Sequence, residues 1–102
     1  MPTVVAMFNL KPGKSVTEYE QWAKQRNLPT VNSLKSVDEY QVYRCLGLLG
    51  TGKPAPFQYV ELIQVNDMEG LFGDLAAPFM QTMTEEFEAF AVDAAFVVCE
   101  AL

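Results

Sequence analysis

Residues 58–65 read QYVELIQV, and this stretch decides how the fold is interpreted. Aromatic and β-branched residues are frequent in it, which is typical of a β-strand. Both of its faces are largely apolar, and a single carboxylate, Glu61, stands at its middle. A strand that leaves one face in water alternates polar and apolar residues. The pattern therefore predicts a strand that is covered on one side by helices and on the other by something else.

The segments around this stretch predict the order strand, helix, strand, strand, helix, strand. Ser15 and Glu18 have the spacing of a capping box at the start of a helix, and Asn66 and Glu69 repeat that spacing. Pro29 is expected to end the first helix near Asn27 and Leu28. The expected strands are Thr3–Asn9, Val37–Leu48, Phe57–Val65 and Ala94–Ala101. A short second helix is expected over Pro29–Leu34. Another helix is expected after Asn66 and, beyond a break at residues 76–78, a further one from Pro78.

This order predicts an α+β fold of the ferredoxin-like βαββαβ type in one domain spanning residues 1–102. Such a domain has a four-stranded antiparallel sheet with its helices on one face. The first, third and last strands are apolar on both faces, so the second sheet face would form a large exposed apolar patch in a monomer. We therefore expect a homodimer that packs sheet against sheet.

Composition excludes several classes of function. The net charge is −6, from 13 acidic and 7 basic residues, and this argues against binding to nucleic acid or to anionic membranes. The chain has no histidine, and Cys45 and Cys99 lack the spacing of a metal site, so we expect buried reduced thiols and no metal or other cofactor. No basic leader and no apolar run of about 20 residues is present, which favours a cytoplasmic protein.

Several short motifs resemble one known family. They are FNLKPG at residues 8–13, YEQWA at 19–23, LPTV at 28–31 and NDM at 66–68. Together they are similar to the REDY-like HapK family over nearly the whole chain. The resemblance implies a ferredoxin-like dimer, the dimeric α+β barrel, and an association with the biosynthesis of prodigiosin-type pyrrole pigments. It implies no particular catalytic residues.

Glu61 and Arg44 are the candidate catalytic residues. They occupy central positions of two strands that we expect to be hairpin neighbours. One interpretation is an ion pair that satisfies both groups, or exposure at a sheet edge, since charged residues are rarely buried alone. The other is a polar spot in an apolar pocket, where Glu61 acts as a general base or hydrogen-bond acceptor and Arg44 anchors an anion.

Five further residues are candidate ligand-binding residues. Asn9 ends the first strand, where a polar side chain can reach a cavity or simply stabilise the following turn. The aromatic residues Tyr19, Trp22, Tyr43 and Tyr59 can line a pocket or belong to an ordinary core, and a buried Trp22 would need a hydrogen-bond acceptor. The run at residues 85–88 is expected to be a solvated helix face.

The loop at residues 47–56 has the glycine and lysine spacing of a phosphate-binding loop. Pro54 stands where that motif needs Ser or Thr, and a strand follows instead of a helix, so nucleotide binding is not expected. The loop is either a flexible hairpin connection or a lid over a pocket.

Two classes of function follow from the sequence. The first is a protein that binds a small apolar or aromatic molecule. The alternative is a cofactor-free enzyme, such as an oxygenase, cyclase or isomerase, that uses Glu61, Arg44 and Trp22. A dimerisation module without any ligand is a third, less informative interpretation. The position of Glu61 in the fold separates these hypotheses.

Overall fold

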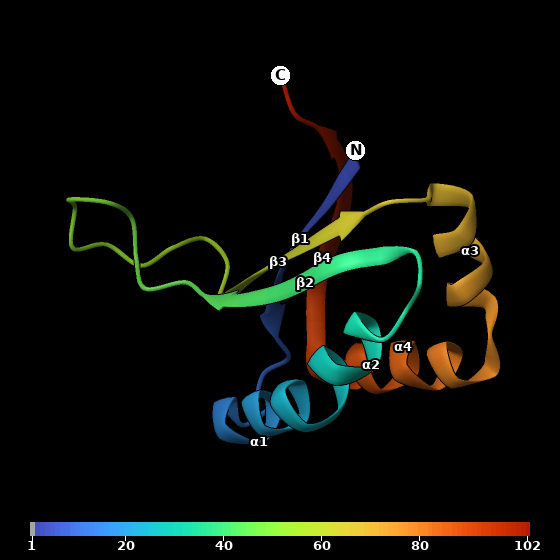
Figure 1. The fold of residues 1–102 in the computed structure, drawn as a ribbon. Helices are drawn as coiled ribbons and strands as arrows, with labels where there is room; N and C mark the ends of the chain where they lie inside the picture. The colour runs from blue at the N-terminus through green and yellow to red at the C-terminus, as the bar shows by residue number, and fades with distance from the viewer. Residues whose placement is uncertain (1) are drawn as a thin grey trace.

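A computed structural model describes residues 2–102 and places one sheet above a layer of helices (Figure 1). The elements are β1 (Pro2–Leu10), α1 (Val16–Trp22), the π-helical segment η1 (Ala23–Asn27), α2 (Leu28–Asn32), β2 (Val37–Arg44), β3 (Tyr59–Val65), α3 (Met68–Ala76), α4 (Pro78–Phe90) and β4 (Ala91–Glu100). No helix in this part of the chain has the length and apolar character needed to cross a membrane.

The sheet has the strand order β2-β3-β1-β4, and all its neighbouring strands are antiparallel. In Figure 1, α1, α2 and α4 lie on the same side of the sheet, and α3 connects the end of β3 to α4. This is the ferredoxin-like α+β architecture that the order of elements predicts, so that prediction is confirmed.

The first helix does not end before Pro29 as the sequence predicted. Ser15 caps it as expected, because its side chain accepts a hydrogen bond of 3.2 Å from the backbone N–H of Glu18. The helix then widens into η1, where the N–H of Leu28 bonds to the carbonyl of Ala23. Pro29 follows inside the first turn of α2, a position that needs no backbone N–H. The chain thus stays helical through Asn32.

The second helical region breaks at the predicted place. α3 ends at Ala76, Ala77 is extended with φ −65° and ψ 143°, and α4 starts at Pro78. The expected cap at Asn66 is wrong, because its side chain bonds instead to the carbonyl of Lys35 at 2.9 Å and to Asp38 at 2.8 Å. Asn66 therefore ties β3 to the start of β2.

The strands β2 and β4 differ most from their expected bounds, whereas β1 and β3 differ by one or two residues at their ends. β2 ends at Arg44 rather than at residue 48, and the loop that follows contains Gly47, Gly50 and Gly52 at positive φ. β4 begins at Ala91, directly after α4, and its pairing with β1 shifts register between Met7 and Asn9. A bulge of this kind bends the strand and lets it leave the helix without a loop.

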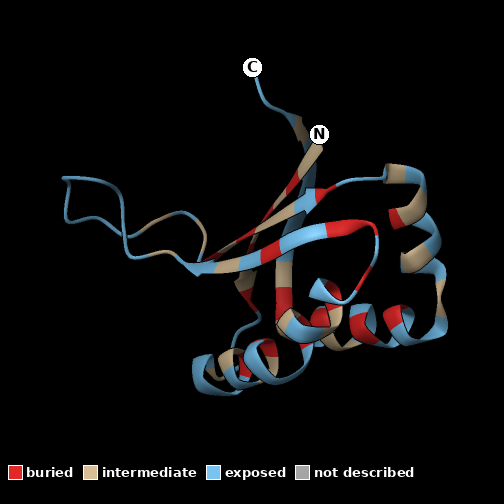
Figure 2. Cartoon of the chain, viewed as in Figure 1, coloured by how far each residue is buried: buried red, intermediate tan, exposed pale blue. Residues whose placement is uncertain are grey.

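The core lies between the sheet and the helices, as the buried segments in Figure 2 show. Its aromatic part is formed by Phe8, Tyr19, Tyr59 and Phe87. The Phe8 ring contacts Phe87 edge-on, with centroids 4.9 Å apart, and stacks on Tyr59 at 5.5 Å. This cluster fixes α1 and α4 beneath β1 and β3.

The opposite face of the sheet is apolar at its centre. The register alternates side chains across the sheet, so Val5 on β1 and Leu62 on β3, which pair directly, face away from the helices. Val97 on β4 pairs with Val5 on that same outer face and is 43% exposed. This agrees with the sequence pattern of strands that are apolar on both sides.

Candidate small-molecule cavity beneath the sheet

A cavity of about 540 Å³ lies between the sheet and the helices α2, α3 and α4. This volume is in the range of pockets that hold small organic molecules. Its wall is mostly apolar, and the larger apolar side chains include Phe72, Phe87, Phe96, Met68, Met80 and Met83. The few polar groups in the wall include Glu61, Asn27 and Tyr40, which come from β3, η1 and β2.

Glu61 points from the middle of β3 into this cavity. It is 3% exposed, and its Oε1 atom has no hydrogen-bond partner within residues 2–102. Burial raises the pKa of this carboxyl to about 7, and the nearby Tyr40 hydroxyl offsets part of the rise. A carboxyl group with such a pKa exchanges protons near neutral pH, which suits a general base.

Asn27 and Tyr40 form a polar contact beside Glu61. The Tyr40 hydroxyl donates a hydrogen bond of 2.6 Å to Oδ1 of Asn27, and both residues are buried. Asn27 follows Tyr19 and Ala23 at intervals of four residues, so it lies on the buried face of the first helix. Tyr40 reaches the same point from β2, two residues before Val42, the β2 partner of Glu61.

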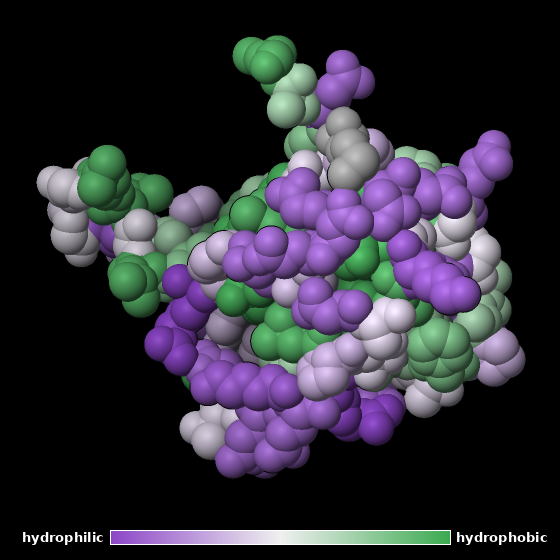
Figure 3. All heavy atoms as spheres, viewed as in Figure 1, coloured by the Kyte–Doolittle hydropathy of each residue, from purple (hydrophilic) through white to green (hydrophobic). Residues whose placement is uncertain are grey.

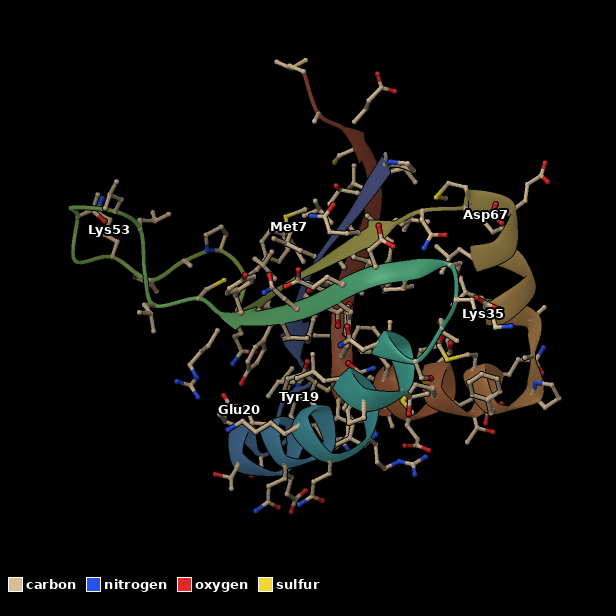
Figure 4. The ribbon with its side chains drawn as sticks, in the orientation of Figure 1. Met7, Tyr19, Glu20, Lys35, Lys53 and Asp67 are labelled. Carbon is tan, nitrogen blue, oxygen red and sulfur yellow. The ribbon has the colours of Figure 1, made fainter. Side chains whose placement is uncertain are left out.

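The Tyr19 hydroxyl is a second buried polar group near Glu61. Burial raises its pKa most, and the Glu61 carboxylate raises it further. Like Oε1 of Glu61, this hydroxyl has no hydrogen-bond partner within the described chain. Figure 4 shows Tyr19 between α1 and the sheet. Its ring belongs to the aromatic core, and its hydroxyl belongs to the polar region around Glu61.

The expected pair of Glu61 and Arg44 is wrong. The register places Val42 opposite Glu61 and Tyr59 opposite Arg44. The Arg44 side chain is 59% exposed and binds Glu20, with 2.8 Å from Nε to Oε2. That hydrogen bond, together with one from the Tyr59 hydroxyl at 2.8 Å, lowers the pKa of Glu20 to about 2. Arg44 therefore lies outside the main cavity.

The other candidate residues lie outside the main cavity. Trp22 has the acceptor that its indole was expected to need, because Nε1 donates to Oε1 of Glu86 at 2.7 Å. Glu86 also binds Arg26, so the 85–88 run is not simply a solvated face. Asn9 accepts from the backbone N–H of Gln58 at 2.9 Å. These contacts are structural.

Two aromatic candidates have different surroundings. Tyr43 lies on the outer face of the sheet and is 46% exposed. Tyr59 lies on the helix side with Tyr19 and Arg44, where a separate hollow of about 120 Å³ opens near Glu20. Neither Tyr43 nor Tyr59 lines the main cavity.

The loop between β2 and β3 is not a lid over the main cavity. It projects away from the helices, and Figure 4 shows Lys53 near its far end. None of its residues lines the main cavity. Leu46 and Leu49 on this loop are 91% and 100% exposed, and Figure 3 shows apolar atoms on the projection.

Comparison with known proteins places the chain in a family. The model of the REDY-like protein HapK family matches residues 2–102. The chain belongs to this family. A search of curated proteins returned no match.

Solved structures share the fold. The crystal structure of HapK from Hahella chejuensis has a TM-score of 0.81 and 24% identity, covering 100% of this chain and 93% of that one. SnoaB, a cofactor-independent oxygenase from Streptomyces nogalater, has a TM-score of 0.75 and 15% identity, with coverage of 98% and 91%. A dimeric ferredoxin-like protein of Thermobifida fusca has a TM-score of 0.74 and 14% identity, with coverage of 98% and 90%.

Sequence reasoning missed Asn27 and Tyr40. A signal for Asn27 was present, since an amide at four-residue spacing from Tyr19 and Ala23 stands on an apolar helix face. The alternation of residues along β2 puts Tyr40 on the same strand face as Arg44, but its contact with Asn27 has no signal in the sequence. Finding these residues required knowing that the helix continues through Pro29.

Proposed function

We propose that this protein binds a small apolar or aromatic molecule in the cavity between the sheet and α2–α4, with Glu61 as the polar anchor. One observation carries the proposal: Glu61, a buried residue whose Oε1 atom has no hydrogen-bond partner within the described residues, lines a cavity of about 540 Å³. Buried polar groups nearly always have hydrogen-bond partners, and an exception calls for an explanation such as a ligand.

The apolar wall of the cavity favours ligand binding, because a ligand would displace water from apolar surface. Leu75, Phe72 and Phe96 line the cavity and are 39%, 65% and 56% exposed, so an apolar ligand would remove part of their surface from solvent. The association with pyrrole pigments that the family resemblance implies is consistent with such a ligand and remains part of this proposal.

Binding can be tested with N-phenyl-1-naphthylamine, a neutral aromatic amine whose fluorescence increases in apolar surroundings. Thr82 and Thr84 on α4 are both exposed, but only Thr84 lines the cavity. We expect T84W to fill the cavity and weaken binding about tenfold or more, and T82W to bind as the wild type does. Equal binding by both variants, or no binding by the wild type, would contradict the proposal.

Cofactor-free proton transfer is the second candidate function. It is favoured by the free Oε1 atom of Glu61 and by the pKa of about 7 that burial gives this carboxyl. SnoaB, described as a cofactor-independent oxygenase, has the same fold. In this hypothesis Glu61 removes a proton from an acidic C–H bond of the ligand. Arg44 and Trp22, the other residues first considered, would have no direct part in it.

The proton-transfer hypothesis has a direct assay. 2-Tetralone is an apolar bicyclic ketone with acidic C–H bonds next to its carbonyl group. In D₂O at neutral pH, the carboxylate would take a proton to give the enolate, and a deuteron from solvent would return to carbon. NMR should show faster exchange with the wild type than with buffer, and E61Q should remove the difference. Equal exchange with wild type and E61Q would reject Glu61 as the base.

We also propose that the protein that contains this cavity is a homodimer. The outer face around Val5, Leu62 and Val97 is apolar and would be covered by the same face of a second copy. The Thermobifida fusca protein of the same fold is described as dimeric. The cavity lies on the helix side of the sheet, so two copies can meet through their outer faces without occupying it.

A further inference from the structure

We infer that the ligand is an uncharged or cationic aromatic molecule that donates one hydrogen bond, from an N–H or O–H group, to the carboxylate of Glu61. This inference rests on the proposed function, because it specifies the chemical class of molecule that the same cavity would bind. It excludes aromatic acids and other anions.

The charges of the cavity wall support this exclusion. Glu61 and Glu88 are the charged residues that line the described cavity, and none of its lining residues is Lys or Arg. A carboxylate or phosphate ligand would lose its hydration there without gaining a cationic partner, and it would lie near a carboxyl group of the same sign. Burying an unpaired charge in such a place is strongly unfavourable.

The hydrogen bonds of the cavity support the requirement for a donor. The carboxylate of Glu61 lines the cavity, and its Oε1 atom has no hydrogen-bond partner within the described residues. A ligand with an N–H or O–H group would satisfy that acceptor. A ligand of the same shape without a donor would cover it and leave it unpaired, so it would bind more weakly.

The apolar wall supports an aromatic framework. Met80 and Met83 from α4 and Phe72 from α3 line the same cavity as Glu61. Thioether and phenyl groups make favourable contacts with the edges and faces of flat rings. The ligand class is thus a flat apolar framework with a single polar donor.

Three naphthalenes of similar size test this inference by isothermal titration at pH 8, where Glu61 is mostly ionised. 2-Naphthol carries the donor, 2-methoxynaphthalene lacks it and 2-naphthoate carries a negative charge. We expect wild-type protein to bind 2-naphthol about tenfold more tightly than 2-methoxynaphthalene, and 2-naphthoate most weakly. E61L should lose the preference for 2-naphthol. E61Q, which keeps an acceptor oxygen, and E69L, a control at an exposed position of α3, should retain it.

The outcomes separate this inference from the proposed function. Equal affinity of the wild type for all three compounds would overturn the inference and leave binding in the cavity intact. A preference that persists in E61L, with circular dichroism showing a folded protein, would also overturn it. Failure of all three compounds to bind would contradict the proposed function and the inference with it.

Discussion

Glu61 combines deep burial with an unpaired oxygen, and this should make the protein's stability depend on pH. The folded-state pKa of about 7 lies above the ordinary value of 4.5, so the folded protein holds this proton more tightly than the unfolded chain does. The stabilisation from the protonated carboxyl is fully present below about pH 4.5 and is lost as the pH rises through 7.

We therefore predict that E61Q is more stable than the wild type at pH 8.5, by about 3 kcal/mol, the free energy that corresponds to this difference in pKa. The gap should close toward pH 4.5. Urea unfolding of both proteins across this pH range measures it, with E39Q as an exposed control on β2. A constant difference between E61Q and the wild type would show that Glu61 does not titrate as described.

Glu86 is the second residue with a specific prediction. It accepts hydrogen bonds from the indole of Trp22 and from Arg26, and the Arg26 bonds and then the Trp22 bond lower its pKa. E86A would leave the partly buried indole N–H unpaired and should cost about 1–3 kcal/mol of stability. E85A, at the exposed neighbouring position, should change the free energy of unfolding by less than about 0.5 kcal/mol. Equal effects in urea unfolding would count against the role of Glu86.

At this scale the sequence identified Glu61 as the residue to examine and predicted that Trp22 needs a hydrogen-bond acceptor, which the structure shows to be Glu86. It paired Glu61 with the wrong residue, because the strand register depends on where the long hairpin loop begins. β2 ends at Arg44, four residues earlier than expected, and this places Val42 opposite Glu61.

The helices α3 and α4 are separated by one extended residue, and two glycines in α3 differ in their surroundings. A Cβ atom at Gly73 would meet nothing within 4 Å, whereas one at Gly70 would approach Oδ2 of Asp67 to 2.6 Å. We predict that G73A stabilises the protein by about 0.5–1 kcal/mol through helix propensity. G70A should gain less or lose stability, because Asp67 has to move. Thermal unfolding of both variants compares them, and equal gains would contradict this description of α3.

Elements with strong periodicity and clear stop signals were predictable. The break at Ala77, the cap at Ser15 and the four strands all follow from local sequence. The π-helical segment could not be predicted from local sequence, because Pro29 signals an end to the helix. The chain stays helical there with Asn27 and Val31 packed toward the sheet. That difference moved Asn27 into the site.

The whole molecule presents one covered and one uncovered face of its sheet, and this leads to a prediction about assembly. Leu62 stands at the centre of the outer face. L62R would place a charge in the proposed dimer interface, so we expect light scattering to show a dimer for the wild type and a monomer for L62R. Q21R, at an exposed position of α1 away from that face, should remain dimeric. A monomeric wild type at micromolar concentration would contradict the homodimer.

Fold class was predictable at this scale because the order of elements limits the possible topologies. The cavity was not, since it depends on how far α3 and α4 stand from the sheet, which is a matter of packing between distant segments. Glu61 illustrates this difference. Its place in a strand can be predicted from the sequence, but the burial that changes the chemistry of its carboxyl group depends on the helices that enclose it.

The ionisation of Glu61 in the presence of a ligand tests the central claim most directly. The ¹³Cδ resonance of Glu61, assigned by its absence in E61Q, can be followed by NMR from pH 4 to pH 9. The account predicts a midpoint near 7 in the free protein and a clear shift of the resonance when 2-naphthol is added. A midpoint near the ordinary 4.5, with no response to 2-naphthol, would contradict the claim that Glu61 is buried in a ligand-binding cavity.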